Sequence, residues 1–297
     1  MGNPIFTGAG VALVTPFHAD GSVNFEKLAE LVEFQLANET DAIIACGTTG
    51  EASTLTDDEQ IEVIRCVVDK VAGRVPVIAG AGSNDTNHGV ELCVRAEKAG
   101  ANALLLVTPY YNKTSQKGLI EHYTAMAASV DLPIILYNVP GRTGLNITAK
   151  TTQTLSHVEN IVATKEASGN ITQIAEVAHL CDGTDFAIYS GNDDQIVPLL
   201  SLGAKGVISV LSNVAPKETH DMVVKFLAGD VAGARKLQLD AMPLVSALFS
   251  DVNPIPVKAA LNLMGMNVGG YRRPLTSMSD DALKALAAAM KDYGLIQ

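Results

Sequence analysis

One lysine lies where the sequence predicts the interior of a sheet. Lys165 ends the short apolar run Ile161–Lys165, in which Ile161, Ala163 and Lys165 fall on one face by strand alternation. An ammonium group on a buried face is costly unless it is paired or neutralised. Desolvation favours the neutral amine, which is the form that attacks a carbonyl carbon to give a Schiff base. Lys165 is therefore a candidate nucleophile, and a structural ion pair with an interior carboxylate is the alternative.

A tyrosine ends the apolar run that precedes the run of Lys165. Tyr137 and Asn138 close the run Pro133–Asn138. Adjacent strands lie about 4.8 Å apart, so the phenol and the amine meet if both face inward. A phenol beside an amine suits proton transfer during imine formation and collapse. Alone, Tyr137 is best interpreted as a packed aromatic ring; beside Lys165, a catalytic role is the preferred interpretation.

Two further segments suit the binding of an anion. Thr48 and Thr49 lie in a turn flanked by glycines, where successive backbone N–H groups can hold a carboxylate. Arg142 lies in a Pro-Gly-Arg-Thr-Gly loop and can form paired hydrogen bonds with a carboxylate. The alternatives are an ordinary turn before a helix and an arginine that faces water. Ile208, near the end of another apolar run, is expected to line the same substrate site.

The elements that position these residues alternate along the chain. Eight short apolar runs are each followed by a segment with helical spacing, which is typical of a closed (β/α)₈ TIM barrel; an open, doubly wound sheet is the alternative. In such barrels the active site lies where strands end and the following loops begin. The predicted strands are Gly10–Thr15, Ala42–Cys46, Val75–Ala79, Ala103–Thr108, Pro133–Asn138, Ile161–Lys165, Phe186–Ser190 and Gly206–Val210.

The predicted helices fall between these runs. Thr56 and Glu59 form a capping-box pattern at the start of the second helix. The predicted helices are Phe25–Ala37, Asp57–Val71, Thr86–Ala99, Lys117–Ala128, Thr148–Leu155, Thr172–Leu180, Asp194–Leu202 and Pro216–Ala228. Three more, at 231–249, 256–264 and 280–293, follow the eighth unit. We therefore predict a catalytic barrel over residues 1–228 and a C-terminal helical extension over residues 229–297, packed on the barrel.

Composition excludes several classes of protein. The chain has 297 residues, 47% of them hydrophobic, and a formal net charge of −11. An acidic chain without a basic cluster argues against nucleic acid or an anionic membrane as a partner. The histidines and the four cysteines have no metal-binding spacing, so no metal site is expected. No dinucleotide or phosphate-loop motif is complete, so no nucleotide cofactor is expected. Without a secretory signal or a membrane-spanning run, the expected location is the cytoplasm.

Four motifs together resemble the dihydrodipicolinate synthase (4-hydroxy-tetrahydrodipicolinate synthase) family, of the N-acetylneuraminate lyase superfamily. The motifs are GTTGE at 47–51, TPYYN at 108–112, YNVPGRTG at 137–144 and KEASGN at 165–170. Each motif alone is moderately specific for this family. The four motifs in this order, at the ends of predicted strands, are together very specific for it. The resemblance covers nearly the whole chain. The Thr48-Thr49 pair and Arg142 favour the synthase over the lyases of the superfamily.

The resemblance implies a role for each catalytic residue. Lys165 would form an imine with pyruvate, and Tyr137 would act as general acid and base. Thr48 would link Tyr137 to Tyr111 in a proton relay, and Tyr111 would come from a partner subunit across a tight dimer interface. The usual assembly is a homotetramer built as a dimer of dimers.

The resemblance also implies the substrates and the product. The turn at Thr48 and Thr49 would hold the pyruvate carboxylate, and Arg142 the carboxylate of aspartate 4-semialdehyde. The product, 4-hydroxy-tetrahydrodipicolinate, would enter lysine and diaminopimelate biosynthesis. Three alternatives stay open: a sugar-acid lyase or aldolase that uses the same imine, a metal-dependent barrel hydrolase, and a non-catalytic barrel that binds a small acid.

The resemblance finally suggests an effector site. Many members are inhibited by lysine at the dimer interface, and a glutamate typically stands where this chain has His88. Without that glutamate the effector's ammonium group loses an anionic partner, so weak or absent inhibition by lysine is predicted; compensation by Asp57 is the alternative. The matching positions are Ala52, Ser53, Asp57, Gln60, Asn84, His88 and Tyr110.

Overall fold

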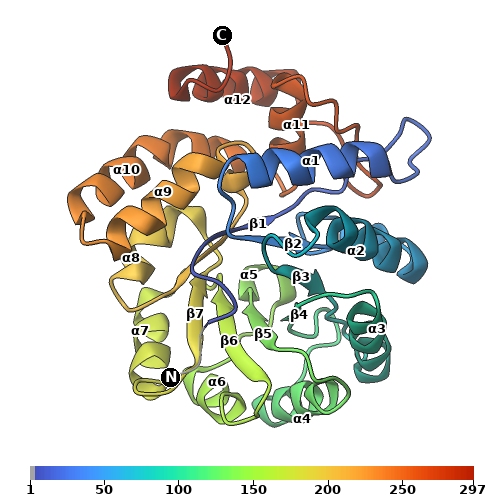
Figure 1. The fold of residues 1–297 in the computed structure, drawn as a ribbon, viewed down its shortest axis with the longest axis vertical. Helices are drawn as coiled ribbons and strands as arrows, with labels where there is room; N and C mark the ends of the chain where they lie inside the picture. The colour runs from blue at the N-terminus through green and yellow to red at the C-terminus, as the bar shows by residue number, and fades with distance from the viewer. Residues whose placement is uncertain (1–3) are drawn as a thin grey trace.

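Eight parallel strands form a closed barrel in the computed structural model, which describes residues 4–297 (Figure 1). Each strand pairs with the next in the chain, and β8 pairs back with β1. This confirms the predicted TIM barrel and excludes the open sheet. The strands are β1 (Gly8–Ala12), β2 (Ala42–Ala45), β3 (Val77–Gly80), β4 (Ala103–Val107), β5 (Ile134–Asn138), β6 (Ile161–Glu166), β7 (Ala187–Ser190) and β8 (Gly206–Ser209).

Helices surround the barrel and cover the outer face of its strands (Figure 1). Their amphipathic faces bury aliphatic side chains against the sheet, which accounts for the apolar runs in the strands. The helices are α1 (Phe25–Ala37), α2 (Asp57–Val71), α3 (Thr86–Lys98), α4 (Gln116–Ala127), α6 (Ala149–Leu155), α7 (Ile171–Leu180), α8 (Ile196–Leu200) and α9 (Pro216–Leu227). The capping box at Thr56 and Glu59 is present at the start of α2, as predicted.

Short helical turns occupy several loops at the ends of the strands. They are η1 (Ala52–Thr54), α5 (Pro140–Thr143), η2 (Asp193–Gln195) and η3 (Leu211–Asn213). The helix predicted over 194–202 is instead the turn η2 followed by the short helix α8. Pro198 accounts for the division: a proline has no N–H and is best tolerated in the first turn of an α-helix, which suits a helix that begins at Ile196.

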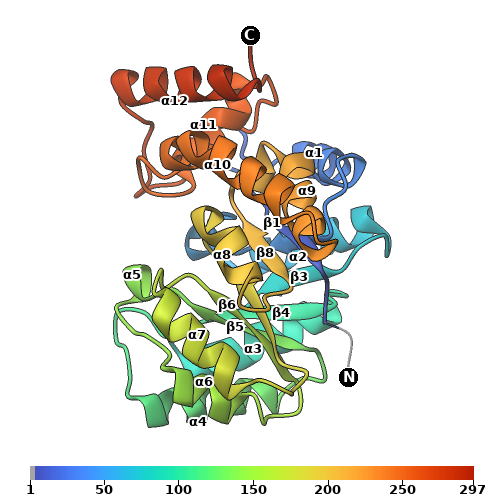
Figure 2. The ribbon, with the colours of Figure 1, turned by 90° about the vertical axis from the view of Figure 1, so that its left-hand side faces the viewer.

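Three C-terminal helices pack together at one side of the barrel (Figures 1 and 2). They are α10 (Val231–Leu248), α11 (Ile255–Leu263) and α12 (Asp280–Tyr293). Helix α10 packs against both α9 and α12. The three predicted C-terminal helices are therefore present, and the division between residues 228 and 229 stays a prediction.

The first strand begins two residues earlier than predicted and ends before Leu13. Gly8 adopts a φ of 125° and pairs with Gly206 of β8. A Cβ atom on Gly206 would lie 1.9 Å from the carbonyl oxygen of Gly8, so this closure of the barrel requires glycine. The sequence prediction placed the strand at Gly10–Thr15 because it followed the run of bulky apolar residues. That run gives no sign of the pairing between Gly8 and Gly206.

An extra residue interrupts the alternation of β6. Ile134 pairs with Ile161, but the next residue of β5, Ile135, pairs with Ala163, so Val162 forms a bulge. Ile161 consequently belongs to the outer core, whereas Ala163 belongs to the cluster that fills the barrel. The predicted common face is wrong for Ile161, although Ala163, two residues before Lys165, does face inward.

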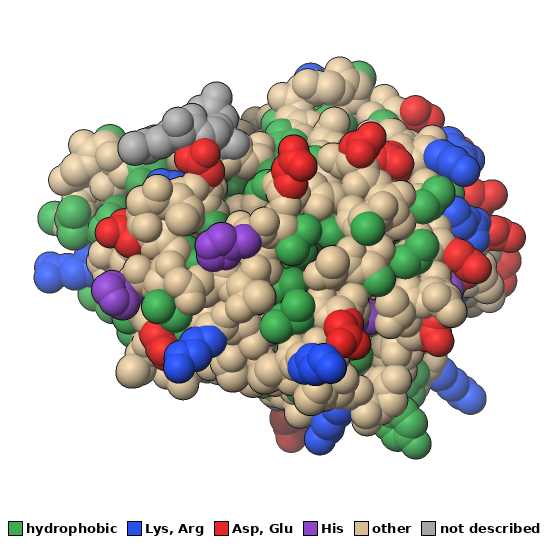
Figure 3. Space-filling model, turned by 90° about the horizontal axis from the view of Figure 1, so that it is seen from below, with side chains coloured by type: hydrophobic (Ala, Val, Ile, Leu, Met, Phe, Trp, Pro, Cys, Tyr) green, Lys and Arg blue, Asp and Glu red, His purple; other side chains and the backbone are tan. Residues whose placement is uncertain are grey.

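No helix in the described part of the chain has the length and apolar character to cross a bilayer. The space-filling view shows Lys and Arg side chains interspersed with Asp and Glu (Figure 3). No basic cluster forms on the part of this face drawn in colour. Mixed charge of this kind does not provide the concentrated positive field that nucleic acids attract.

Candidate active site

Lys165 and Tyr137 meet inside the barrel. They are direct partners in the register of β5 and β6. The Nζ atom of Lys165 lies 4.3 Å from the centroid of the Tyr137 ring, and the two residues are 6% and 7% exposed. The contact predicted from strand spacing is therefore confirmed, and an amine and a phenol share one water-poor environment.

No carboxylate pairs with Lys165 within 4.0 Å among residues 4–297. Glu166 accepts hydrogen bonds from Asn138 and Ser168. The Oδ2 atom of Asp193 accepts the N–H groups of two loop residues after β8. Burial raises the pKa of Asp193, and hydrogen bonds and the charge of Lys165 oppose that rise. The structure therefore does not support a structural ion pair as the reason for Lys165.

Gly191, which follows β7, makes room for the lysine side chain. A Cβ atom at this position would lie 2.7 Å from Cβ of Ala167 and 3.0 Å from Cε of Lys165. Any larger residue would displace Lys165 or the backbone beside it. The sequence showed a glycine after a strand, but only the fold reveals that it borders Lys165.

The turn after β2 leaves backbone donors available. The N–H groups of Gly50 and Glu51 close the turn onto Gly47 and Thr48, 3.1 Å away in each case. The hydroxyl of Thr15 fixes the carbonyl oxygen of Gly50 at 2.6 Å. Within residues 4–297, the N–H groups of Thr48 and Thr49 have no hydrogen-bond acceptor. Two adjacent free N–H groups form an anion-binding arrangement.

A cavity of about 380 Å³ connects this turn with Tyr137 and Arg142. Its volume suits small substrates. Thr48 and all the expected effector positions except Asn84 line the same cavity, so the two expected sites are continuous. Lys165, Thr49 and Ile208 are not part of its lining. The expected effector positions in the lining are Ala52, Ser53, Asp57, Gln60, His88 and Tyr110.

Several side chains at the expected effector end are already paired. Asp57 lies 3.0 Å from Nε2 of His88 and 3.9 Å from Arg95. Gln60 donates to the carbonyl oxygen of Gly80 at 2.7 Å. Asn84, outside the cavity lining, donates at 3.2 Å to the backbone oxygen of Tyr110, which does line it. This end of the cavity therefore offers few groups with unused charge.

The remaining predicted residues differ in how deeply they are buried and in what they contact. Ile208 is 1% exposed and packs in the same interior cluster as Tyr137. Arg142, in α5, donates to the backbone oxygen of Asn253 at 3.2 Å. Tyr111 is 91% exposed, with a φ of 69°. A single chain therefore does not bring Tyr111 to the site.

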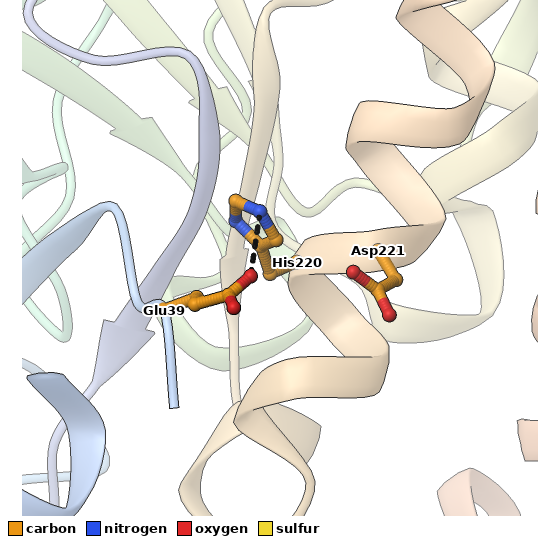
Figure 4. Close-up of side chains that lie close together, drawn as sticks. All are labelled: Glu39, His220 and Asp221. Atoms are coloured by element: carbon orange, nitrogen blue, oxygen red, sulfur yellow. Dashed lines mark ion pairs between the residues drawn. The ribbon is translucent and has the colours of Figure 1, made fainter. Parts of the chain in front are cut away.

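A separate acidic group lies outside the cavity, where α9 meets the loop after α1 (Figure 4). Glu39, His220 and Asp221 offer three ligand atoms within 4.8 Å of one another. The ammonium group of Lys217 already lies 3.0 Å from Glu39 and pairs with Asp221. A positive charge from the chain itself thus balances the carboxylates. Spacing rules missed this group because its members are far apart in sequence.

The closed barrel, with a lysine and an anion-binding turn at its strand ends, places the chain among the (β/α)₈ barrels whose chemistry occurs at that edge. The sequence profile of the Dihydrodipicolinate synthetase family matches residues 5–293, and the chain belongs to that family. The 4-hydroxy-tetrahydrodipicolinate synthase of Lachnoclostridium phytofermentans is 61% identical over 293 residues, which are 98% of this chain and 99% of the relative.

Two solved structures of the family have similar folds. The dihydrodipicolinate synthase of Cyanidioschyzon merolae, with lysine bound, is 44% identical, with a TM-score of 0.96 over 99% of this chain and 100% of that chain. The chloride-inhibited enzyme from Acinetobacter baumannii, complexed with pyruvate, is 43% identical, with a TM-score of 0.95 over 98% of this chain and 99% of that chain.

Proposed function

We propose that the protein condenses pyruvate with aspartate 4-semialdehyde to give 4-hydroxy-tetrahydrodipicolinate, in lysine and diaminopimelate biosynthesis. One structural observation supports this proposal in addition to family membership. Lys165 is buried against Tyr137 and has no carboxylate partner within 4.0 Å among residues 4–297. A buried amine in contact with a phenol is placed to attack a carbonyl carbon and to exchange protons with that phenol.

The first half of the reaction is imine formation. The amine of Lys165 attacks the keto carbon of pyruvate, and loss of water gives a protonated imine on the lysine. This cation withdraws electrons from the neighbouring methyl group, so that a proton leaves and a nucleophilic enamine forms. The lysine itself serves as the electron sink, and the chemistry requires neither a metal nor an organic cofactor.

Tyr137 and the turn after β2 support these steps. The phenol of Tyr137 is next to the amine and can donate a proton to the departing hydroxyl group and accept one from the methyl group. The free N–H groups of Thr48 and Thr49 provide hydrogen bonds for the carboxylate of pyruvate. Thr48 also lines the cavity with Tyr137, which suits a relay of protons between them.

The second half joins the two substrates. The enamine carbon attacks the aldehyde carbon of aspartate 4-semialdehyde, and Arg142 at the cavity binds the carboxylate of that substrate. The amino group of the bound product then displaces Lys165 from the imine, which closes the ring and restores the free amine. We also propose, from family membership, a cytoplasmic homotetramer in which Tyr111 completes the partner's site.

Trapping the imine tests the proposal directly. Borohydride reduces an imine to a stable secondary amine, so treatment in the presence of pyruvate is expected to leave one adduct on the peptide that contains Lys165. The K165A variant serves as the matched control and should show no adduct. A wild-type protein without an adduct, or with one on another lysine, would overturn the proposal. Assays with N-acetylneuraminate or 2-keto-3-deoxygluconate distinguish the related lyases.

The Y137F variant tests the proton transfers separately from binding. It keeps the ring that contacts Lys165 and removes only the hydroxyl group. We expect kcat to fall by about 10²-fold to 10³-fold, the usual contribution of a general acid or base, while the melting temperature changes little. A variant that keeps more than half of the wild-type kcat would remove Tyr137 from the mechanism.

A further inference from the structure

Asn253 contacts both elements expected to bind a substrate carboxylate. It lies between α10 and α11 in the C-terminal extension and is 6% exposed. Its Nδ2 group donates to Oγ1 of Thr49 at 3.0 Å. Its backbone oxygen accepts a hydrogen bond from Nη2 of Arg142 at 3.2 Å. One residue of the extension therefore joins the turn after β2 to the loop after β5.

The bond to Thr49 controls where the threonine hydroxyl can point. A hydroxyl group has one hydrogen to donate and two lone pairs to accept. Because Asn253 donates into one lone pair, the hydrogen of Thr49 must point in another direction. Within residues 4–297, Oγ1 of Thr49 has no other hydrogen-bond partner. The hydrogen is therefore available to an acceptor that does not belong to the chain.

The same turn is held a second time by the extension. Lys258 of α11 pairs with Glu51 at 2.8 Å, and the two side chains are 0% and 1% exposed. Lys258 also donates to the backbone oxygen of Thr15, whose own hydroxyl holds the turn. This support fixes the position of the extension relative to the turn, so the amide of Asn253 meets Thr49 in a defined geometry.

The oxygen of the Asn253 amide supports the view that this side chain is present for its contact with Thr49. Oδ1 of Asn253 is buried and has no hydrogen-bond partner within residues 4–297. A buried acceptor without a donor destabilises the folded protein. An apolar side chain of similar size would avoid that cost, so stability alone does not explain an asparagine at this place. Donation by Nδ2 to Thr49 does explain it.

We propose that Asn253 is a positioning residue that directs the hydroxyl hydrogen of Thr49 toward the carboxylate of pyruvate. This inference rests on the proposed function, which places pyruvate at the turn. The amide acts through Thr49 and does not touch the substrate. Its backbone oxygen holds Arg142 independently of the side chain, so substitutions of the side chain affect pyruvate more than aspartate 4-semialdehyde.

Steady-state kinetics of N253A and N253D test this assignment. N253A removes the donor, and we expect KM for pyruvate to rise about tenfold, the factor that one hydrogen bond of ordinary strength provides. KM for aspartate 4-semialdehyde and kcat should change by less than about threefold. N253D offers only acceptors, so it draws the hydroxyl hydrogen of Thr49 away from the substrate and should raise KM for pyruvate further.

A double-mutant cycle separates positioning from general loosening of the fold. If Asn253 acts through the hydroxyl of Thr49, T49V/N253A should bind pyruvate no worse than T49V alone, within about twofold. Additive losses would overturn the inference, as would an unchanged KM for pyruvate in N253A. The matched control is N262A, which removes the hydrogen bonds of another asparagine of the extension, to the backbone of Gly269 and Val268, away from the turn. It should leave KM for pyruvate unchanged.

Two further measurements keep the outcomes distinct. If N253A does not fold, as judged by circular dichroism, the isosteric N253D carries the test. Borohydride trapping of wild-type protein with pyruvate tests the proposed function by itself. An adduct on Lys165 together with additive behaviour of Thr49 and Asn253 would reject only this inference. The absence of an adduct would reject the proposed function on which it rests.

Discussion

Two lysines are buried among residues 4–297, and their surroundings differ. Lys258 pairs with Glu51 and donates to a backbone oxygen, so its charge is balanced and its donors are used. Burial lowers the pKa of Lys258, and the charge of Glu51 opposes that change. Lys165 has no carboxylate within 4.0 Å among residues 4–297, and it packs against the ring of Tyr137 and beside Gly191. The first arrangement suits a structural role, and the second suits a nucleophile.

A buried carboxyl group next to Lys165 makes stability depend on pH. Burial raises the pKa of Glu166 to about 7 from 4.5, against hydrogen bonds from Asn138 and Ser168. The folded protein therefore binds a proton at this group between pH 4.5 and 7 that the unfolded chain releases. Stability from this group is complete below about pH 4.5 and is lost as the pH rises through 7.

The E166Q variant is expected to remove this dependence. The wild-type protein should lose about 3 kcal/mol of stability relative to E166Q between pH 4.5 and pH 8, since one pKa unit corresponds to about 1.4 kcal/mol. Urea unfolding of both proteins across that range measures the difference. A constant gap between the two curves would show that Glu166 titrates alike in the folded and unfolded states.

Residues that are close in the strand pattern were predictable, and residues joined by the fold were not. Strand alternation and the spacing of neighbouring strands were enough to bring Tyr137 to Lys165. Asn253 is 204 residues from Thr49, and no local pattern marks their contact. Gly191 is one of many glycines in loops, and only the fold places it beside Lys165. Local periodicity carries no information about such long-range contacts.

At the scale of elements, α11 stabilises the turn after β2. The ion pair between Lys258 and Glu51 is buried, and Oε2 of Glu51 also accepts the backbone N–H of Arg272 at 3.1 Å. Glu51 itself has a φ of 56°, an unfavourable conformation for a residue with a side chain. The turn therefore keeps its shape through contacts with the C-terminal extension and not through local preference.

The K258M variant is expected to destabilise the protein by about 3–5 kcal/mol, because it leaves the buried charge of Glu51 without the ammonium group that balances it. The double variant K258M/E51L removes both charges and should recover part of that loss. Urea unfolding measures each difference. K284M is the matched control, since its pair with Asp281 is exposed and should contribute less than about 1 kcal/mol. Equal losses in K258M and K284M would contradict the argument.

The expected effector end of the cavity also belongs to this scale, since it lies between α2, α3 and β4. Asp57 of α2 is the carboxylate available to replace the glutamate absent at His88, but it already pairs with His88 and Arg95. A lysine effector would have to displace these partners to bind its ammonium group. Inhibition by lysine should therefore be weak.

Rates measured with and without 1 mM lysine check this prediction, and we expect a change of less than twofold. The H88E variant removes His88, the nearer of the two partners of Asp57, and adds a carboxylate, so it should become more sensitive to lysine than the wild type. Strong inhibition of the wild-type protein at sub-millimolar lysine would show that the paired Asp57 is sufficient for binding.

At the scale of the whole molecule, a single chain does not bring all of its predicted catalytic groups together at one site. Lys165 and Tyr137 lie together in the barrel, and Thr48 lines the cavity with Tyr137. Tyr111 points into solvent at 91% exposure from a loop with a left-handed backbone. A large aromatic side chain held in that conformation is costly in an isolated chain. A partner subunit that receives the ring would account for it.

Mixed oligomers of two inactive chains test this arrangement. K165A lacks the nucleophile but keeps Tyr111, whereas Y111F keeps the nucleophile and lacks the hydroxyl group. We expect the first variant to be inactive and the second to lose about 10²-fold in kcat.

In a mixed dimer, the K165A chain supplies Tyr111 to the Lys165 of its partner, so one complete site forms. Random pairing of equal amounts makes half of the dimers mixed, and about a quarter of the wild-type activity should return. Coexpression of the two chains, followed by a comparison of the rate with the mean of the separately purified variants, measures the recovery. A rate equal to that mean would place the hydroxyl of Tyr111 in its own chain's site or outside the mechanism.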